Sequence, residues 1–204
     1  MPKAWLQDRK RDYYYKKAKE EKYRSRAAYK LLQAVKKYHF IKEGDVVLDL
    51  GAAPGGWVQA ARKNVGNTGC VLGVDLKSVE PFEEQNVRTI IGDINDEEAL
   101  REILALLPKQ ADAVISDVSP NISGVWEVDH ARQMGLSLKA LEIAEETLRP
   151  SGSFFVKVFQ GDMFDDFVKK VKNLFQDVRI VKPEASRGKS SELFILGLNL
   201  KKTA

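Results

Sequence analysis

The sequence of 204 residues contains one cysteine, Cys70, and two histidines, His39 and His130. An intramolecular disulfide is therefore impossible, and a zinc site built from several cysteines is excluded, so no metal is expected. No apolar run approaches the roughly 18 residues that a membrane span needs, and the charged N-terminus does not resemble a secretory signal. We expect a cytoplasmic protein with no membrane contact, and the lack of a long exposed apolar stretch favours a monomer.

The charges are unevenly distributed along the chain. Residues 1–42 hold 14 Lys and Arg against 4 Asp and Glu, whereas residues 43–204 hold 19 against 25. A basic leader on a mildly acidic remainder is typical of a protein that meets a polyanion, although a solvated helix face would look the same. We expect residues 1–42 to form a basic helical extension of a single domain that covers residues 43–204.

Short apolar runs alternate with amphipathic stretches from residue 45 onward. Strands are expected at 46–50, 70–75, 87–91, 113–117, 153–159, 178–181 and 192–200, and helices at 56–64, 96–107, 129–148 and 162–175. The helix at 96–107 is expected to bury Leu100, Ile103, Leu104 and Leu107. This alternation predicts an α/β fold with a seven-stranded, mostly parallel sheet, helices on both faces and an antiparallel edge.

The turn after the first strand, Asp49–Trp57, is rich in small residues that let a ligand approach the backbone closely. It is not a dinucleotide-binding Gly-x-Gly-x-x-Gly motif, because Ala53 replaces a glycine and Pro54 lacks an amide that could donate to phosphate. It also lacks the Gly-Lys-Ser/Thr of a phosphate-binding loop. A flat ligand without phosphates fits this turn better.

Acidic residues follow the next two strands. Asp75 ends the second strand, where a carboxylate can accept hydrogen bonds from ribose hydroxyls, and Asp93 follows the third, where it could meet an adenine amino group. Each aspartate could instead cap a turn or helix. Taken together, the three strand ends predict an adenosine pocket with no grip on phosphate, and S-adenosylmethionine is such a ligand.

Charged residues also interrupt apolar strands. Lys157 lies inside Phe154–Phe159, and a lysine there is costly to bury unless it is paired or neutral. Glu192 opens the apolar last strand, and Asp117 ends the fourth strand. In the expected strand order, Asp117 and Lys157 are neighbours at the carboxyl edge. A lysine reaching water from an edge strand and a carboxylate at the rim are the simpler alternatives.

These segments resemble the FtsJ/RrmJ family of S-adenosylmethionine-dependent ribose 2′-O-methyltransferases. The resemblance runs over about residues 25–200, in the family's order, through 25–31, 49–57, 116–121, 155–159 and 186–192. Mapped onto this sequence, the family's catalytic tetrad falls on Lys30, Asp117, Lys157 and Glu192. Its cofactor contacts fall on Gly55, Trp57, Asp75, Asp93 and Asp117, and the turn residues Gly51, Ala53, Pro54 and Gly56 are expected to border the same ligand.

The resemblance implies methylation of a ribose 2′-hydroxyl with Lys157 as the base. The segment from Asn121 to Gly124 is similar to the branch that modifies large-subunit ribosomal RNA, and the Gly-Ala-Pro-Asp typical of the tRNA branch is absent. We expect a uridine in large-subunit RNA as the target. Methylation of tRNA, or a non-catalytic RNA-binding assembly factor, are the alternatives.

The basic leader is expected to guide RNA to this site. Its cations could neutralise phosphates and its interleaved tyrosines could stack on bases. The cations are Lys10, Arg11, Lys16, Lys17, Lys22, Arg24 and Arg26. Packing of Tyr13, Tyr14 and Tyr15 onto the body is the alternative reading of the tyrosines.

Other methyltransferase classes fit less well. A cytosine-C5 enzyme needs a cysteine nucleophile, but Cys70 begins the second strand, at the end away from the expected pocket. A base-amino enzyme usually carries Asn/Asp-Pro-Pro-aromatic after the fourth strand, which Asp117–Pro120 does not match. A small-molecule O-methyltransferase would leave the basic leader without a purpose.

Overall fold

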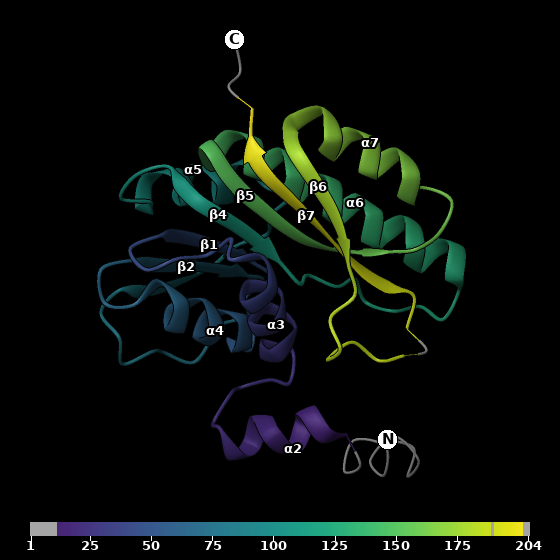
Figure 1. Ribbon diagram of the computed structural model, residues 1–204. Coiled ribbons are helices and arrows are strands. Elements are labelled where there is room, and N and C mark those ends of the chain that lie inside the picture. The colour runs from purple at the N-terminus through teal and green to yellow at the C-terminus, as the bar shows by residue number, and fades with distance from the viewer. Residues whose placement is uncertain (1–11, 189, 202–204) are drawn as a thin grey trace.

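A computed structural model describes residues 12–188 and 190–201. Its centre is a seven-stranded sheet in the order β3-β2-β1-β4-β5-β7-β6 (Figure 1). The strands are β1 Val46–Leu50, β2 Cys70–Asp75, β3 Val87–Ile91, β4 Ala111–Ser116, β5 Leu148–Phe159, β6 Phe175–Val181 and β7 Glu192–Leu200. The α/β fold expected from the alternation of apolar and amphipathic segments is thus confirmed.

The direction of the strands places the functional residues at one edge of the sheet. β1 pairs in parallel with β2 and β4, β2 with β3, and β4 with β5. β7 runs antiparallel between β5 and β6 and forms the closing hairpin with β6. Glu192, at the start of β7, therefore pairs with Phe159 at the end of β5. The first residue of β7 and the last residues of β1, β2 and β4 all lie at the carboxyl edge.

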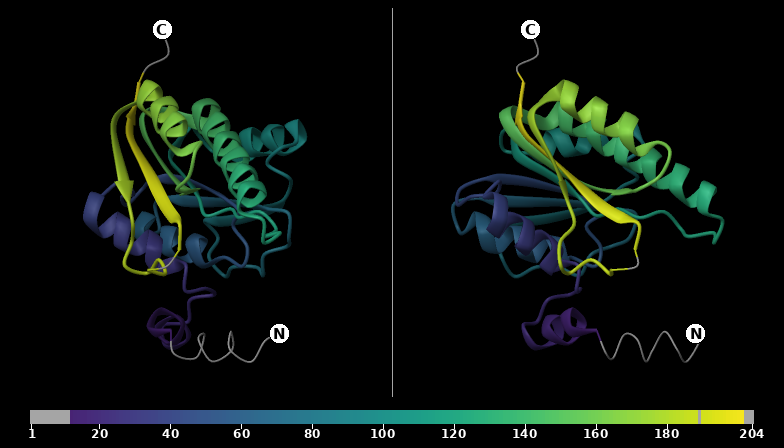
Figure 2. Two further views of the ribbon diagram at one scale, coloured as in Figure 1. Left: turned by 90° about the vertical axis from the view of Figure 1, so that its right-hand side faces the viewer. Right: turned by 45° about the vertical axis from the view of Figure 1, so that its right-hand side comes forward.

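Helices cover both faces of the sheet (Figures 1 and 2). One layer contains α3 Ala28–Tyr38 and α4 Gly56–Val65, and the other contains α5 Glu97–Leu106, α6 Trp126–Thr147 and α7 Phe164–Leu174. Each layer has its own apolar core, because the strand side chains alternate between the two faces. None of the helices that the structure describes could span a lipid bilayer.

The described part of the leader, from residue 12 onward, contains α2 and α3 and packs on the body. α2 Tyr13–Glu20 lies beside α3, with Ala18 buried against Tyr29. The rings of Tyr14 and Tyr29 are 5.4 Å apart, and the Tyr29 hydroxyl donates to Glu21 at 2.9 Å. Burial first and then the Glu21 hydrogen bond raise the pKa of Tyr29. The leader is thus held to the body by aromatic packing.

Three local expectations were wrong. α6 begins at Trp126 rather than at residue 129, because the Asp129 carboxylate accepts from the amides of Ser123 and Gly124 and holds the preceding loop against the first turn. β5 begins at Leu148, the last residue of the helix expected at 129–148, because Leu148 pairs with Ala111 and the register shifts between Ala111 and Ala113 of β4.

The third error concerns the buried face of α5. Leu104 is 47% exposed, whereas Ala99 and Ile103 are buried. The inward stripe of α5 therefore follows the four-residue step from Ala99 to Ile103, which turns Leu104 toward solvent. An alanine can pack against a sheet as well as a leucine can. The prediction placed the leucines inward because it considered hydrophobicity alone.

Candidate active site

The turn between β1 and α4 bends closely over the neighbouring strand. The amides of Gly51 and Ala52 donate to the Val74 carbonyl at 2.8 and 3.0 Å. Gly51 has a φ of +85°, and a Cβ there would lie 2.8 Å from Val118, in the loop after β4. Glycine is therefore required at this position both by its backbone conformation and by the close approach.

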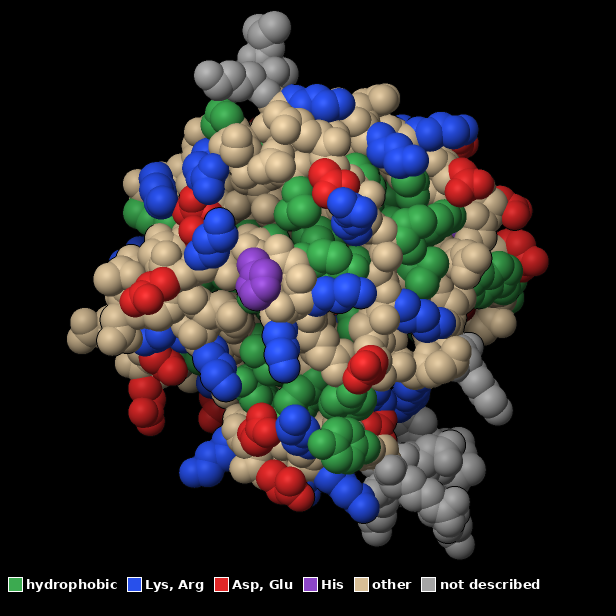
Figure 3. Space-filling view, viewed as in Figure 1, with side chains coloured by type: hydrophobic (Ala, Val, Ile, Leu, Met, Phe, Trp, Pro, Cys, Tyr) green, Lys and Arg blue, Asp and Glu red, His purple; other side chains and the backbone are tan. Residues whose placement is uncertain are grey.

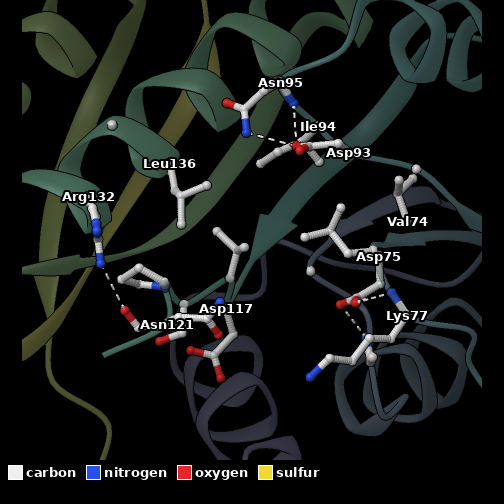
Figure 4. Close-up of a pocket in the computed structure, with 18 residues that line it drawn as sticks. Val74, Asp75, Lys77, Asp93, Ile94, Asn95, Asp117, Asn121, Arg132 and Leu136 are labelled. Atoms are coloured by element: carbon white, nitrogen blue, oxygen red, sulfur yellow. Dashed lines mark hydrogen bonds between the residues drawn. The ribbon is translucent and has the colours of Figure 1, made fainter. Parts of the chain in front are cut away.

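A cavity of about 640 Å³ opens beside this turn, at the carboxyl ends of β1, β2 and β4 (Figure 4). Asp75 accepts from the Ala53 amide at 2.9 Å through Oδ2 and from the Lys77 amide at 2.9 Å through Oδ1. Asp93 accepts from the backbone and the side chain of Asn95 at 2.9 and 2.8 Å. Both carboxylates border a cavity of the size that holds small-molecule cofactors.

The structure divides the expected cofactor residues into two groups. Gly51, Ala53, Asp75, Asp93 and Asp117 line the cavity, and Pro54, Gly55, Gly56 and Trp57 do not.

Gly55, Gly56 and Trp57 face the leader instead, and Pro54 is exposed. Trp57 is only 3% exposed, stacks on Phe155 and donates from Nε1 to the Ala27 carbonyl at 2.8 Å. A Cβ on Gly55 would meet Arg24, and one on Gly56 would meet Ser25. These contacts therefore pack the turn against the segment before α3.

The four expected tetrad residues lie together at the same edge. Lys30, on the first turn of α3, places Nζ 2.8 Å from Glu192 Oε2 and 3.4 Å from Asp117 Oδ2. Lys157 Nζ lies 3.3 Å from Asp117 Oδ1 and donates to the Asp117 carbonyl at 2.8 Å. Asp117 therefore bridges the two lysines, and it is the one tetrad member that also lines the cavity.

Further polar groups fix the tetrad. Lys157 Nζ also donates to Ser119 Oγ at 2.8 Å, and the Ser186 hydroxyl donates to Glu192 Oε1 at 2.9 Å. The Lys157 carbonyl accepts from Ser137 and Gln133 of α6 at 2.9 and 3.2 Å. The Lys157 backbone is thus tied to α6 while its amine is held at the edge of the sheet.

The charges within the tetrad compensate one another. Burial alone would favour a neutral Lys30, but Asp117 and then Glu192 outweigh it and raise the Lys30 pKa above its usual value. Burial likewise opposes the ionised form of Asp117, but Lys157 and Lys30 together hold its pKa below its usual range. Two lysines and two carboxylates balance, so a bound cation would give the site a net positive charge.

Asp49 is a second buried carboxyl near the cavity. It lies on β1 and is fully buried, and neither oxygen has a hydrogen-bond partner among the residues that the structure describes. Burial, followed by the charges of Asp117 and Asp75, raises the pKa of Asp49 well above its usual value. The carboxyl is therefore neutral well above the pH at which an exposed aspartate ionises.

Sequence reasoning gave no role to several residues of the site. Ser119 and Ser186 lie in segments used for the family resemblance, but nothing in their spacing distinguishes them. Asp49 carries the same signal as Lys157, a charge inside an apolar strand, and could have been found by it. Arg132 and Gly135 line the cavity from α6, and the glycine inside a 22-residue helix is the signal that was available.

Known proteins are similar to this chain over most of its length. Residues 23–200 match the model of the FtsJ-like methyltransferase family. Among curated proteins, "Ribosomal RNA large subunit methyltransferase E" of Methanocaldococcus jannaschii is 54% identical over 197 residues, 95% of this chain and 80% of its own. The protein of that name from Methanothrix thermoacetophila is 55% identical over 190 residues, 93% of this chain and 73% of its own.

Solved structures show the same fold. A Plasmodium falciparum protein described as a ribosomal RNA methyltransferase superposes with a TM-score of 0.76 at 30% identity, covering 89% of this chain and all of its own. Aeropyrum pernix fibrillarin, solved with S-adenosyl-L-methionine, superposes with a TM-score of 0.61 at 18% identity, covering 86% of this chain and 75% of its own.

Proposed function

The chain belongs to the FtsJ-like methyltransferase family, and on that premise we propose that it methylates the ribose 2′-hydroxyl of a uridine in large-subunit ribosomal RNA. S-adenosyl-L-methionine is its methyl donor. The observation that carries the proposal is the position of Asp117, which lines the cofactor cavity and also bridges Lys30 and Lys157. The side chain of Asp117 would thus lie next to both the bound methyl donor and the lysine that removes the proton.

The cavity suits an adenosine without phosphates. Asp75 and Asp93 present carboxylates at adjacent strand ends, and Val74, Ile94 and Leu136 add apolar side chains to the lining (Figure 4). Asp75 would accept from ribose hydroxyls and Asp93 from the adenine amino group. When bound, the cofactor supplies an electrophilic methyl group on a positively charged sulfur.

The tetrad would activate and hold the acceptor. Lys157, as a free amine, would accept the 2′-hydroxyl proton as the oxygen attacks, and the hydrogen bonds from Nζ to the Asp117 carbonyl and Ser119 fix its direction. Lys30 and Glu192, joined at 2.8 Å, would hold the ribose. General-base assistance contributes typically about 10²–10⁴-fold, and positioning adds to it.

RNA would reach the active site along the surface of the leader. A groove of about 1250 Å³ between α2, α3 and residues 180–184 is lined by Lys17, Lys36, Lys37, Lys63 and Lys182. Figure 3 shows this side of the molecule with Lys and Arg side chains spread over it. Tyr13 is 65% exposed and could stack on a base, although its ring also packs edge-to-face on Tyr14 at 5.2 Å, and Tyr14 packs on Tyr29.

Not every expected phosphate contact is available. Arg24 donates to the carbonyls of Glu80 and Pro81, and Arg26 pairs with Asp12 and the Ala185 carbonyl, so both side chains have internal roles. Lys16 and Lys22 are exposed. Lys10 and Arg11 lie outside the described residues. The lysines are therefore the cations that we assign to RNA.

The test is methyl transfer from labelled S-adenosyl-L-methionine to large-subunit RNA and to tRNA, followed by mapping of 2′-O-methyl positions. We expect one large-subunit uridine to be modified, and Lys157→Ala to lower the single-turnover rate at saturating RNA by about 10²-fold or more. Modification of tRNA alone would overturn the choice of substrate. RNA binding without transfer would favour an assembly factor, and a near-normal rate for Lys157→Ala would overturn the assignment of the base.

A further inference from the structure

Next to the tetrad lies an exposed apolar and aromatic surface, which we call the rim shelf: Ile122, Val125, Trp126, Phe159 and Met163. Ile122, Val125, Trp126 and Met163 are 63%, 53%, 44% and 40% exposed. Large exposed apolar side chains gathered at one place usually mark a binding site. The methylation mechanism above uses none of them.

Strand pairing fixes the position of the rim shelf relative to the tetrad. Phe159 is paired with Glu192 and lies two residues beyond Lys157 on β5, a Cα separation of about 7 Å. Trp126 stacks on Phe159, with ring centroids 6.0 Å apart and planes at 19°. The N-terminal end of α6, which carries Trp126, projects past the edge of the sheet (Figure 2). The backbone of Phe159 is therefore about 7 Å from the backbone of Lys157, so the shelf and the tetrad meet at the same end of β5.

The rim shelf is supported from behind. Trp126 also stacks on His130, with ring centroids 5.5 Å apart, and His130 is only 6% exposed. The Met163 amide donates to His130 Nε2 at 3.3 Å. A Cβ on Gly161 would lie 2.7 Å from the His130 ring, so glycine is needed for the β5–α7 loop to close on this ring. The indole is therefore held in one orientation before any ligand arrives.

We propose that the rim shelf stacks the base of the nucleotide whose ribose enters the tetrad. An unpaired base has an apolar face of aromatic size, and proteins that bind single-stranded RNA hold such bases on aromatic side chains. A base splayed from its neighbours would lie on Trp126 and Phe159 while its sugar faces Lys157. This inference rests on the proposed function, because it concerns the same RNA substrate.

The first experiment compares variants in the full-length enzyme. Trp126→Ala is expected to lower kcat/KM for an RNA oligonucleotide carrying the mapped methylation site by roughly 5- to 150-fold, the range found when one stacked base is lost. Trp126→Phe should recover most of the loss, because it retains an aromatic face. Leu104→Ala, which removes an apolar side chain 47% exposed on α5, is the matched control and should change nothing. Equal activity of wild type and Trp126→Ala would overturn the proposal.

A second experiment separates stacking from support of the fold. The same oligonucleotide is made with an abasic ribose at the target, which retains the 2′-hydroxyl but lacks the base. Loss of the base should slow wild type strongly and Trp126→Ala little further, because both changes remove one contact. Losses that multiply would show that Trp126 acts elsewhere, either in the fold or on another partner such as a ribosomal protein, and would overturn the proposal.

Indole fluorescence provides a readout that does not depend on methyl transfer. Trp5 is changed to Phe, and Trp57, only 3% exposed, stays as a constant background. The target oligonucleotide should quench Trp126, and the abasic form should quench it much less. If wild type methylates no RNA and no site can be mapped, the proposed function fails, and the same assay with uridine 5′-monophosphate against ribose 5-phosphate still decides whether the shelf takes a base. Equal quenching by both RNAs would overturn the shelf while leaving the proposed function intact.

Discussion

Replacing Asp117 by Asn removes the one charge shared by both lysines of the tetrad. In the native protein the carboxylate lies 3.4 Å from Lys30 Nζ and 3.3 Å from Lys157 Nζ. Without it, Glu192, which contacts Lys30 alone of the two, is the remaining carboxylate of the tetrad. Removing one partner of a buried ion pair costs about 3–5 kcal/mol. Since the Asp117 side chain keeps 16% exposure and Asn can still accept one hydrogen bond, we expect about 3 kcal/mol.

Urea denaturation measures this loss directly. With a slope of about 2 kcal/mol per M, a loss of about 3 kcal/mol lowers the unfolding midpoint by about 1.5 M. The matched control is Asp166→Asn, which removes an exposed carboxylate 2.9 Å from Lys169 on α7 and should leave the midpoint unchanged.

The pH dependence identifies the cause. The pKa of Asp117 is lowered in the folded state, so its stabilisation is present above the unfolded pKa of about 3.9 and is lost as the pH falls through the folded value. The gap between wild type and Asp117→Asn should therefore be full at pH 7 and shrink below about pH 4. A gap of the same size at pH 7 and pH 3 would show that packing, not charge, was lost, and would refute the reasoning.

Three further changes test the cofactor side. Gly51→Ala should destabilise the fold by about 1–3 kcal/mol, because φ is +85° and the new Cβ would lie 2.8 Å from Val118; an unchanged urea midpoint would contradict this. Since the pKa of Asp49 is raised, wild type should lose stability relative to Asp49→Asn as the pH rises above about 4, and parallel pH profiles would contradict the buried neutral carboxyl. Asp75→Asn should weaken binding of S-adenosyl-L-methionine in calorimetry by about tenfold or more, because an amide cannot accept from both the Ala53 amide and the ribose as a carboxylate does. Unchanged affinity would exclude Asp75 from the site.

The parts of the fold that could be predicted are those in which local sequence and global position agree. The continuous apolar run around Lys157 favoured a buried strand, in which a lysine is paired or neutral, and the expected strand order made Asp117 its neighbour. The start of α6 could not be predicted in the same way, because Asp129 looks like a cap and instead holds the loop at Ser123. Leu104 was misplaced because the amphipathic pattern fits two neighbouring stripes, and only the position of the sheet selects between them.

The same limit applies to the site. Asp75 and Asp93 follow strand ends, and the sequence therefore places them correctly at the cavity. Gly55 and Gly56 were assigned to the cofactor by the family resemblance and by their place in the turn; in the structure they lie outside the lining of the cavity, and Arg24 and Ser25 lie against them. A glycine in the sequence indicates that another group approaches the backbone closely, but it does not identify that group. The neighbour here lies about 30 residues away in the chain and becomes visible only once the leader has folded onto the body.

The contact between Arg24 and the turn links the leader, where RNA would bind, to the cavity where the methyl donor would bind. Arg24 lies over the Phe82 ring at 3.8 Å, holds the carbonyls of Glu80 and Pro81, and touches the turn at Gly55. If RNA binds the leader and shifts it, the turn beside the methyl donor would shift as well, and a bound donor would in turn bias the leader. By thermodynamic linkage, whatever factor RNA imposes on the affinity for the donor, the donor imposes on the affinity for RNA. Loading order and exchange of spent cofactor would then be set from the leader, at a distance from the reacting atoms.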